Sequence, residues 1–437
     1  MEWWIVLPVI FGMLMLLFAL GIPIVFSFLI INMIGAYALW GGEAGLQQLP
    51  LNMFKSVSLF SLLAIPMFLF MGEIMFRTGI ASQVFHALGK WMGRLPGRLS
   101  ILAVGSGTLF AILCGSSVAT TSLLGSLLVP EMDKKGYKPA MSIGPIVGSA
   151  GLAILIPPTA LGVLMATLAS VPVGNFLVAI VVPGVLLALI FFLYIIVRCL
   201  LQPELAPAYE VETFTMKEKL GDFFKYIFPL GFIVFLVLGV ILLGVATPTQ
   251  SAVLGAMGTM LMALAYRKLT WKLLWESLTG TTKMTVMILT IMVGSATFSQ
   301  ILSYTGVTQG LVSAVTAFDL SPVLLIVIVQ LVLIVLGCFL EPLSIMMMTL
   351  PVVMPIVHSM GIDPIWFCVI FLINMQMATM TPPFGMDLFA MKAAAPHYSM
   401  GAIYRGIFPF ILMNLLLIAL LIAFPPLATW LTGFIRM

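Results

Sequence analysis

Two clusters of polar residues interrupt long apolar stretches of this sequence, and their residue types suit the binding of a small cation. The first cluster comprises Gly115, Ser116, Ser117, Pro157 and Thr159, and the second comprises Glu341, Ser344, Thr379, Thr381 and Pro382. Proline frees backbone carbonyls in the preceding turn, and free carbonyls and hydroxyls are oxygen ligands for a hard cation such as Na⁺. We therefore predict one Na⁺ site from each cluster.

Ser117, Thr120 and Asp387 are also candidate contacts for a substrate. For Asp387, the sequence equally allows a structural role with a neighbouring partner. A carboxylate inside an apolar run, such as Glu341, costs about 2.5–3.5 kcal/mol on membrane-insertion scales, so it needs a compensating role. Glu341 could provide it as a site ligand, or as the cap of a helix that begins with Pro342.

Other polar residues in apolar stretches have simpler interpretations. Asn374 and Gln376 precede the second proline pair and could bond backbone groups freed there. Lys392 can extend its charged end to water. Glu73 precedes Arg77 by four residues, a spacing that favours an ion pair on one helix.

The composition explains why these polar residues are informative. Of the 437 residues, 62% are hydrophobic and 8% are charged, which is typical of a polytopic helical membrane protein and excludes an ordinary soluble domain. The apolar segments are long and continuous, so a barrel of alternating strands is excluded as well. The lipid bilayer is the expected surrounding, and no nucleic-acid partner is expected.

Breaker residues recur at one fixed offset. Pro130, Gly136, Pro139, Pro157 and Pro158 reappear 225 residues later as Pro355, Gly361, Pro364, Pro382 and Pro383. A shared offset indicates an internal duplication. Helix breaks at matching places in the two halves of a membrane protein are the best indication in sequence of a transporter's binding site.

Each repeat is predicted to contain a helical hairpin followed by a broken helix. The hairpins cover 99–132 and 322–360, and the broken helices cover 139–170 and 363–398. Amphipathic segments at 80–98, 268–283 and 306–320 are predicted to lie along the membrane surface. The expected divisions are scaffold helices and a first surface arm (1–98), a first transport half (99–173), further scaffold with a second arm (174–320), a second transport half (321–398) and a C-terminal helix (399–437).

The distribution of Lys and Arg predicts the orientation. With the N-terminus in the periplasm and a cytoplasmic linker at 202–224, only Lys55 and Arg436 of the 19 basic residues lie outside. Five crossings then separate the repeats, so the second copy is inverted. The first hairpin has short arms and is predicted to be re-entrant, whereas 322–360 is long enough for two full spans as an alternative.

Spacing links each hairpin tip to a break. Ser116 to Pro157 and Glu341 to Pro382 are both separated by 41 positions. We therefore expect each break to meet the tip of its own hairpin.

These motifs resemble the large membrane subunit of tripartite ATP-independent periplasmic (TRAP) transporters, the DctM-like family, over nearly the whole length. The resemblance rests on Gly115-Ser116-Ser117-Val118-Ala119, Leu128-Val129-Pro130-Glu131-Met132, Gly136-Tyr137, Leu350-Pro351, Pro355-Ile356-Val357, Asp363-Pro364-Ile365-Trp366-Phe367 and Thr381-Pro382-Pro383-Phe384-Gly385. The sequence departs from the family at Thr120-Thr121-Ser122, where extra hydroxyls either reshape the site or pack against backbone carbonyls.

The resemblance implies an all-α, inverted-repeat fold in which a transport domain moves like an elevator against a scaffold. It further implies Na⁺-driven uptake of an organic acid, usually a carboxylate, across the bacterial inner membrane. The expected partners are a periplasmic substrate-binding protein and a separate small four-helix membrane subunit. Which acid is carried cannot be read from this chain, since selectivity is expected to lie largely in the binding protein.

Two alternatives remain open at this point. The chain could be a stand-alone Na⁺-coupled carboxylate carrier of the same superfamily, which would act without a small subunit. An intramembrane enzyme is a more remote alternative, since the apolar serines have no nearby histidine and no Asp-rich metal motif is present.

Overall fold

The computed structural model describes residues 2–93, 95–207, 209, 214–318 and 320–434. Within these residues all regular structure is helical. Arg436, together with part of the predicted linker (208 and 210–213), lies outside the described residues.

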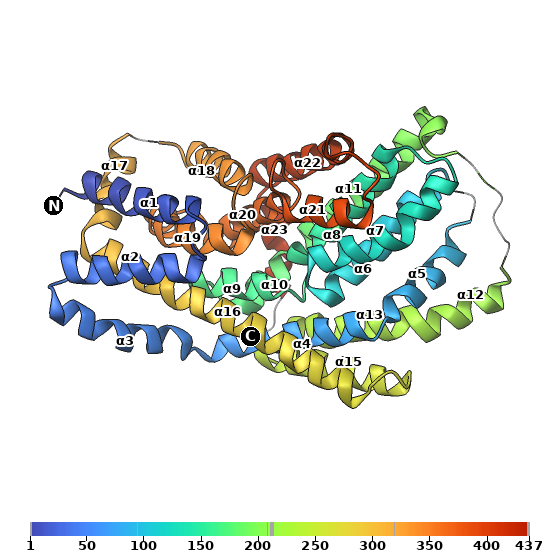
Figure 1. Ribbon diagram of the computed structural model, residues 1–437, viewed down its shortest axis with the longest axis horizontal. Coiled ribbons are helices and arrows are strands. Elements are labelled where there is room, and N and C mark those ends of the chain that lie inside the picture. Colours follow the sequence, from blue (N-terminus) through green and yellow to red (C-terminus); the bar gives the residue numbers. More distant parts are fainter. Residues whose placement is uncertain (1, 94, 208, 210–213, 319, 435–437) are drawn as a thin grey trace.

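The helices follow the same order in two halves of the chain (Figure 1). The first half contains α1 (Trp3–Ala19), α2 (Ile24–Leu39), α3 (Glu43–Val57), α4 (Ala64–Arg77), α5 (Ile80–Trp91), α6 (Arg98–Cys114), α7 (Ser117–Lys134), α8 (Pro139–Leu155), α9 (Ala160–Leu168), α10 (Val173–Ala179) and α11 (Val181–Leu201). The second half contains α12 (Met216–Asp222), α13 (Phe228–Val234), α14 (Val240–Leu242), α15 (Pro248–Ala265), α16 (Trp271–Tyr304), α17 (Val307–Ala317), α18 (Pro322–Gly337), α19 (Pro342–Ser359), α20 (Pro364–Ala378), α21 (Met386–Ala394), α22 (Met400–Ala423) and α23 (Pro426–Thr429).

The internal duplication is visible in the positions at which helices begin. Ser117 and Pro342, the first residues of α7 and α19, are 225 positions apart, as are Pro139 and Pro364 at the starts of α8 and α20. Gly136 and Gly361 follow α7 and α19 with φ of +77° and +66°, the left-handed conformation that ends a helix at low cost only for glycine. The repeated prolines and glycines therefore begin and end equivalent helices in the two copies.

The two hairpins lie on opposite sides of the centre of the molecule. Figure 1 shows α6 and α7 on the right and α18 and α19 on the left, with α5 and α17 at the corresponding ends. The helices of each pair contact one another. This arrangement agrees with inverted repeats.

By length and hydropathy, six helical segments of the described residues can cross a membrane. They are Phe60–Arg77, Val173–Leu201, Met216–Leu242, Trp271–Tyr304, Pro342–Ser359 and Met400–Ala423. Helices α8 and α9, bent by 47° at their break, form a seventh if they are counted as one span.

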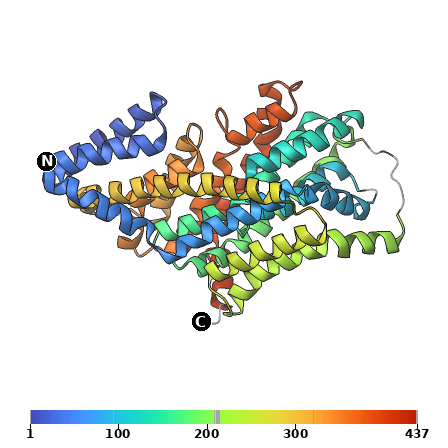
Figure 2. The same ribbon diagram turned by 60° about the horizontal axis from the view of Figure 1, so that its bottom comes forward.

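One predicted surface helix was wrong. Residues 268–283 do not form a separate element, because residues 271–283 are the start of α16, a single helix of 34 residues that runs from the left end of the molecule past its middle (Figure 2). No proline interrupts this stretch, and the lone Gly280 is compatible with a helix interior. Gly280 also allows close packing, since a side-chain carbon there would lie 2.8 Å from the Glu73 carboxyl group.

Two further differences concern polar segments. Helix α3 was not predicted, since its sequence is polar and contains Pro50. The linker predicted over 202–224 becomes helical before its end, because Thr215 and Glu218 form a reciprocal capping box that starts α12.

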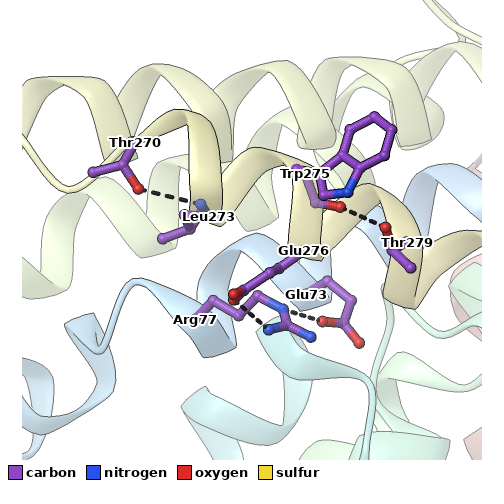
Figure 3. A network of polar contacts seen from close by, with 7 residues as sticks. All are labelled: Glu73, Arg77, Thr270, Leu273, Trp275, Glu276 and Thr279. Carbon is purple, nitrogen blue, oxygen red and sulfur yellow. Dashed lines mark hydrogen bonds and ion pairs between the residues drawn. The ribbon is translucent and has the colours of Figure 1, made fainter.

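The predicted ion pair between Glu73 and Arg77 is confirmed and has a third member. Arg77 Nε lies 2.7 Å from Glu73 Oε2, and its Nη1 lies 3.0 Å from Glu276 Oε2 on α16 (Figure 3). At the start of α16, the Thr270 hydroxyl accepts a hydrogen bond from the Leu273 amide at 3.2 Å. The network fastens α4 to α16 side by side.

Candidate functional site

Helix lengths bring each hairpin tip level with the break of its own repeat. Helices α7 and α8 contact one another, have 18 and 17 residues, and are joined by a short connection. The start of α7 and the end of α8 therefore lie at the same height. The same holds for α19 and α20, with 18 and 15 residues.

The first tip is a two-residue turn between α6 and α7. Gly115 takes up the left-handed conformation, with φ of +61°, and Ser116 caps α7 by accepting a hydrogen bond from the Ala119 amide at 3.3 Å. The Thr120 hydroxyl donates to the Ser116 carbonyl at 2.8 Å. One of the extra hydroxyls at this tip thus packs against the backbone, and Ser117 is left as a buried hydroxyl at the start of α7.

The first break exposes backbone carbonyls inside the protein. Residues 156–159 separate α8 from α9, and all four are buried. Among the described residues, no donor bonds the carbonyls of Ile156, Pro157 or Pro158. Thr159 caps α9 by accepting from the Gly162 amide at 3.4 Å. Buried carbonyls without donors, such as that of Pro157, are available as ligands.

The second break is more fully bonded. The hydroxyls of Thr379 and Thr381 donate to the carbonyls of Gln376 and Met377, at 2.8 and 2.7 Å. The Pro383 carbonyl accepts from the Tyr404 hydroxyl at 3.1 Å, whereas the Pro382 carbonyl has no donor among the described residues.

Gly385 allows the chain to fold back on this second break. A side-chain carbon at Gly385 would lie 2.6 Å from the Thr379 carbonyl oxygen, closer than side chains tolerate. The Asp387 amide then donates to the same carbonyl at 3.0 Å.

The second tip places Glu341 beside α16 and the turn between α1 and α2. Glu341 precedes Pro342 at the start of α19, as predicted, but its carboxylate accepts from the Ser344 hydroxyl at 3.3 Å and caps no backbone amide among the described residues. Both side chains line a cavity of about 430 Å³, whose other walls come from the turn between α1 and α2 and from α16. The predicted second cluster is therefore divided, since Glu341 and Ser344 face this cavity and Thr379 bonds within its own break.

Each tip also meets the other repeat. Helix α21, which follows the second break, packs against α7, and α9 packs against α19. The first of these contacts is close, because a side-chain carbon at Gly125 would lie 2.8 Å from the Ala394 Cβ. The expectation that each break meets its own tip was incomplete, since breaks and tips of the two repeats interleave.

Asp387 lies where this interleaving occurs. The residue is fully buried on α21, and the hydroxyls of Ser117 and Thr379 are its polar neighbours. Neither carboxylate oxygen accepts a hydrogen bond from the part of the chain that the structure describes. Thr121 Oγ1 is a second buried oxygen without a partner, on the same helix as Ser117. A buried carboxylate in such surroundings needs a cation or a proton, because desolvation disfavours an uncompensated charge.

This combination of mirrored hairpins, mirrored breaks and interleaved repeats agrees with the comparisons with known proteins. The family model of the DctM component of tripartite ATP-independent periplasmic transporters matches residues 11–427. The chain belongs to the DctM family.

Curated relatives of this DctM-family chain are large permease proteins. It is 33% identical to the C4-dicarboxylate TRAP transporter large permease protein DctM of Pseudomonas aeruginosa, covering 87% of this chain and 88% of that one. It is 28% identical to the ectoine/5-hydroxyectoine TRAP transporter large permease protein UehC of Ruegeria pomeroyi, covering 97% of both chains. The relatives are permeases rather than enzymes, and the DctM-family chain is a multi-pass membrane transport subunit.

A solved structure shows the same fold. The Alcanivorax borkumensis YdaH transporter superposes with a TM-score of 0.62 at 16% sequence identity, covering 90% of this chain and 89% of that one. At this identity the likeness concerns the fold alone.

Sequence reasoning left two buried polar residues of this DctM-family protein unexplained or misassigned. Thr121 was seen only as a departure from the family, and Asn374 was assigned to freed backbone at its own break. Asn374 instead bonds the Gln330 side-chain oxygen at 2.8 Å and its carbonyl at 3.0 Å, which ties α20 to α18. The signal for both residues was their polarity inside an apolar helix.

Proposed function

We propose that this chain is the Na⁺-coupled transport subunit of a TRAP transporter and that it takes up an organic acid delivered by a periplasmic substrate-binding protein. Membership of the DctM family supports this assignment, as do relatives named for C4-dicarboxylate and ectoine transport. A small four-helix membrane subunit is the proposed second partner.

One observation carries the proposal. The carboxylate of Asp387 is fully buried and has no hydrogen-bond donor among the described residues, and it lies beside hydroxyls from the first hairpin and the second break. A small cation satisfies this carboxylate and the neighbouring hydroxyls together. Release of that cation would leave the buried carboxylate charge unpaired. Cation binding is therefore coupled to the relative position of the first hairpin and the second break, because these two segments supply the ligands.

The proposed Na⁺ ligands come from the two predicted clusters. The first proposed site uses Gly115, Ser116, Ser117, Pro157 and Thr159. The second predicted cluster, Glu341, Ser344, Thr379, Thr381 and Pro382, is divided in this structure, and its members at the break, Thr379, Thr381 and Pro382, are the proposed second site. The donor-free Pro157 carbonyl fits a cation in the first site. Asp387 supplies a charged ligand between Ser117 and Thr379, and Ser117, Thr120 and Asp387 are the proposed substrate contacts.

The proposed mechanism is an elevator motion. Residues 99–173 and 321–398 form the transport domain. Helices α4 and α16, which are joined through Arg77, belong to the scaffold. The N-terminus is proposed to lie in the periplasm, because this orientation leaves few basic residues outside.

The test is uptake into proteoliposomes that contain this chain, its small subunit and the cognate binding protein. An inward Na⁺ gradient should drive accumulation, and its dissipation should abolish it. Ser116→Ala and Thr381→Ala should each raise the Na⁺ concentration for half-maximal uptake. Uptake that proceeds equally with K⁺ in place of Na⁺ would refute the coupling, and unchanged Na⁺ dependence in both variants would refute the site.

Omission of single components tests the partners. Loss of uptake without the small subunit or without the binding protein is expected. Full uptake by this chain alone would instead favour a stand-alone carrier.

A further inference from the structure

A polar cavity lies at the base of the first hairpin, far from the site described above. It has a volume of about 290 Å³ and lies among α5, α6, the end of α7 and the linker. Its charged lining residues are Lys90, Arg98, Glu131 and Lys135. The 18 residues of α7 separate Lys135 from Ser117, a rise of about 27 Å, so this cavity is distinct from the Asp387 region.

Arg98 is held in place in this wall. Its Nη2 donates to the Gly89 carbonyl of α5 at 2.7 Å, and its Nη1 donates to the Tyr209 hydroxyl at 3.4 Å. The Nε of Arg98 is buried and has no partner among the described residues. A guanidinium that is already positioned loses little freedom when it binds an oxyanion.

The linker closes the cavity with aromatic rings. The Lys135 ammonium lies 4.7 Å from the centre of the Tyr209 ring, and the Lys90 ammonium lies 5.0 Å from that of Phe214. Lys90 is also paired with Asp222 at 2.7 Å. Aromatic rings orient ammonium groups without neutralising them, so positive charge is retained at the cavity.

The lining carries a small excess of positive charge. Asp222 neutralises Lys90, which leaves Arg98 and Lys135 against one lining carboxylate, Glu131, and within the described ranges neither Arg98 nor Lys135 forms an ion pair. The Arg98 guanidinium is held by two hydrogen bonds and the Lys135 side chain is exposed beside the cavity, and guanidinium and ammonium groups together are common recognition elements for phosphate.

We propose that this cavity binds a phosphate-class oxyanion. Two sources share this chemistry, namely free inorganic phosphate and the phosphodiester headgroup of an anionic phospholipid, since basic pockets beside membrane helices bind such headgroups. The anion would bridge Arg98, at the start of α6, and Lys135, which follows α7, and it would lie next to the ring of Tyr209. The site is independent of Na⁺ coupling and of the transported substrate.

The experiment uses the full chain in lipid nanodiscs and three variants. Binding of inorganic phosphate is measured by thermal shift and calorimetry in nanodiscs of phosphatidylcholine. Lys135→Gln should weaken binding about tenfold, because it removes one charge-assisted contact. Glu131→Gln should strengthen binding, because it removes the lining carboxylate. Lys134→Gln is the matched control, since Lys134 is an exposed neighbour that does not line the cavity, and it should bind like the wild type.

A second arm distinguishes the sources. Native mass spectrometry of protein from mixed phosphatidylcholine and phosphatidylglycerol nanodiscs should show retained phosphatidylglycerol, reduced in Lys135→Gln, if the ligand is a lipid. Phosphate binding without retained lipid assigns a free anion. The proposal is overturned if the wild type binds neither probe, or if Lys134→Gln loses as much binding as Lys135→Gln. The opposite sign expected for Glu131→Gln separates ligand binding from a general loss of stability.

Discussion

The interleaving of the two repeats predicts that Ser117 and Asp387 act on one bound cation, although they belong to different halves of the chain. Ser117 is 6% exposed and Asp387 is 0% exposed, so water contributes little at either side chain. Asp387→Asn keeps the shape of the side chain and removes its charge. Ser117→Ala removes one neutral hydroxyl.

The expected magnitudes differ for the two changes. A contact to a charged group contributes about 1.5–3 kcal/mol, so Asp387→Asn should raise the Na⁺ concentration for half-maximal uptake by about 10- to 150-fold. A neutral contact contributes about 0.5–1.5 kcal/mol, so Ser117→Ala should raise it by about 2- to 13-fold. If the two side chains share one cation, the effect of the double variant should be smaller than the product of these factors, by a coupling energy of up to about 0.5–1.5 kcal/mol, the whole effect of Ser117→Ala.

The assay is Na⁺-dependent uptake in proteoliposomes for the wild type, both single variants and the double variant. Asp133→Asn serves as control, because Asp133 lies at the other end of α7, where it pairs with His397 at 2.9 Å. It should leave the Na⁺ dependence unchanged. The reasoning is refuted if Asp387→Asn has a wild-type Na⁺ requirement, or if the effects of the two single variants simply multiply.

Three further predictions concern the packing around the site. Gly385→Ala should lower the thermal unfolding midpoint and abolish uptake, because the backbone must move to admit the new carbon, at a cost of about 1–3 kcal/mol. Gly401→Ala is the control and should change neither property, because the nearest atom to its new carbon would lie 4.0 Å away. Arg77→Gln should lower the free energy of unfolding by only about 0.2–1 kcal/mol, because the Arg77 side chain is 31% exposed, and by less at high salt. An equal decrease at low and high salt would contradict an ionic origin. Asn374→Leu should lower the free energy of unfolding by about 1–3 kcal/mol in a chemical-unfolding assay, because Gln330 loses its buried partner. Replacement of both residues by Leu should recover part of this free energy. Absence of any recovery would argue against the Asn374–Gln330 pair as the cause.

Much of the fold could be predicted because its breaks are local features of the sequence. The first hairpin was expected to turn at Gly115-Ser116-Ser117, and α6 ends at Cys114 while α7 begins at Ser117. Glycine permits the left-handed turn and serine caps the next helix, so residue type and structure correspond directly. The Pro157-Pro158 break follows equally from the missing backbone donors.

Other features depend on contacts that residue type does not encode. The close packing of α16 at Gly280 against Glu73 of α4 is one such contact. The neighbours of Asp387 come from α7 and from the second break, and no spacing along the chain indicates the first of these. Ser117, Thr120 and Asp387 were grouped in sequence as substrate contacts, but the sequence did not show that α7 and α21 pack together.

The interleaved packing constrains how any movement can occur. Helix α7 is held by α8 of its own repeat and by α21 of the other, and the second contact allows no side chain between Gly125 and Ala394. Sliding of the first hairpin past α21 would separate Asp387 from Ser117 and open that contact, with a loss of buried apolar area as well as of a polar neighbour. Movement of the two hairpins and both broken helices as one body preserves both interactions. Such a body is also packed closely on α4 and α16, since a side-chain carbon at Gly72 of α4 would clash with the Cys114 carbonyl and Ser295 of α16 donates to the Met347 carbonyl of α19. Because packed interfaces of this kind favour discrete arrangements over continuous deformation, the contacts that surround Asp387 favour keeping the first hairpin and α21 together.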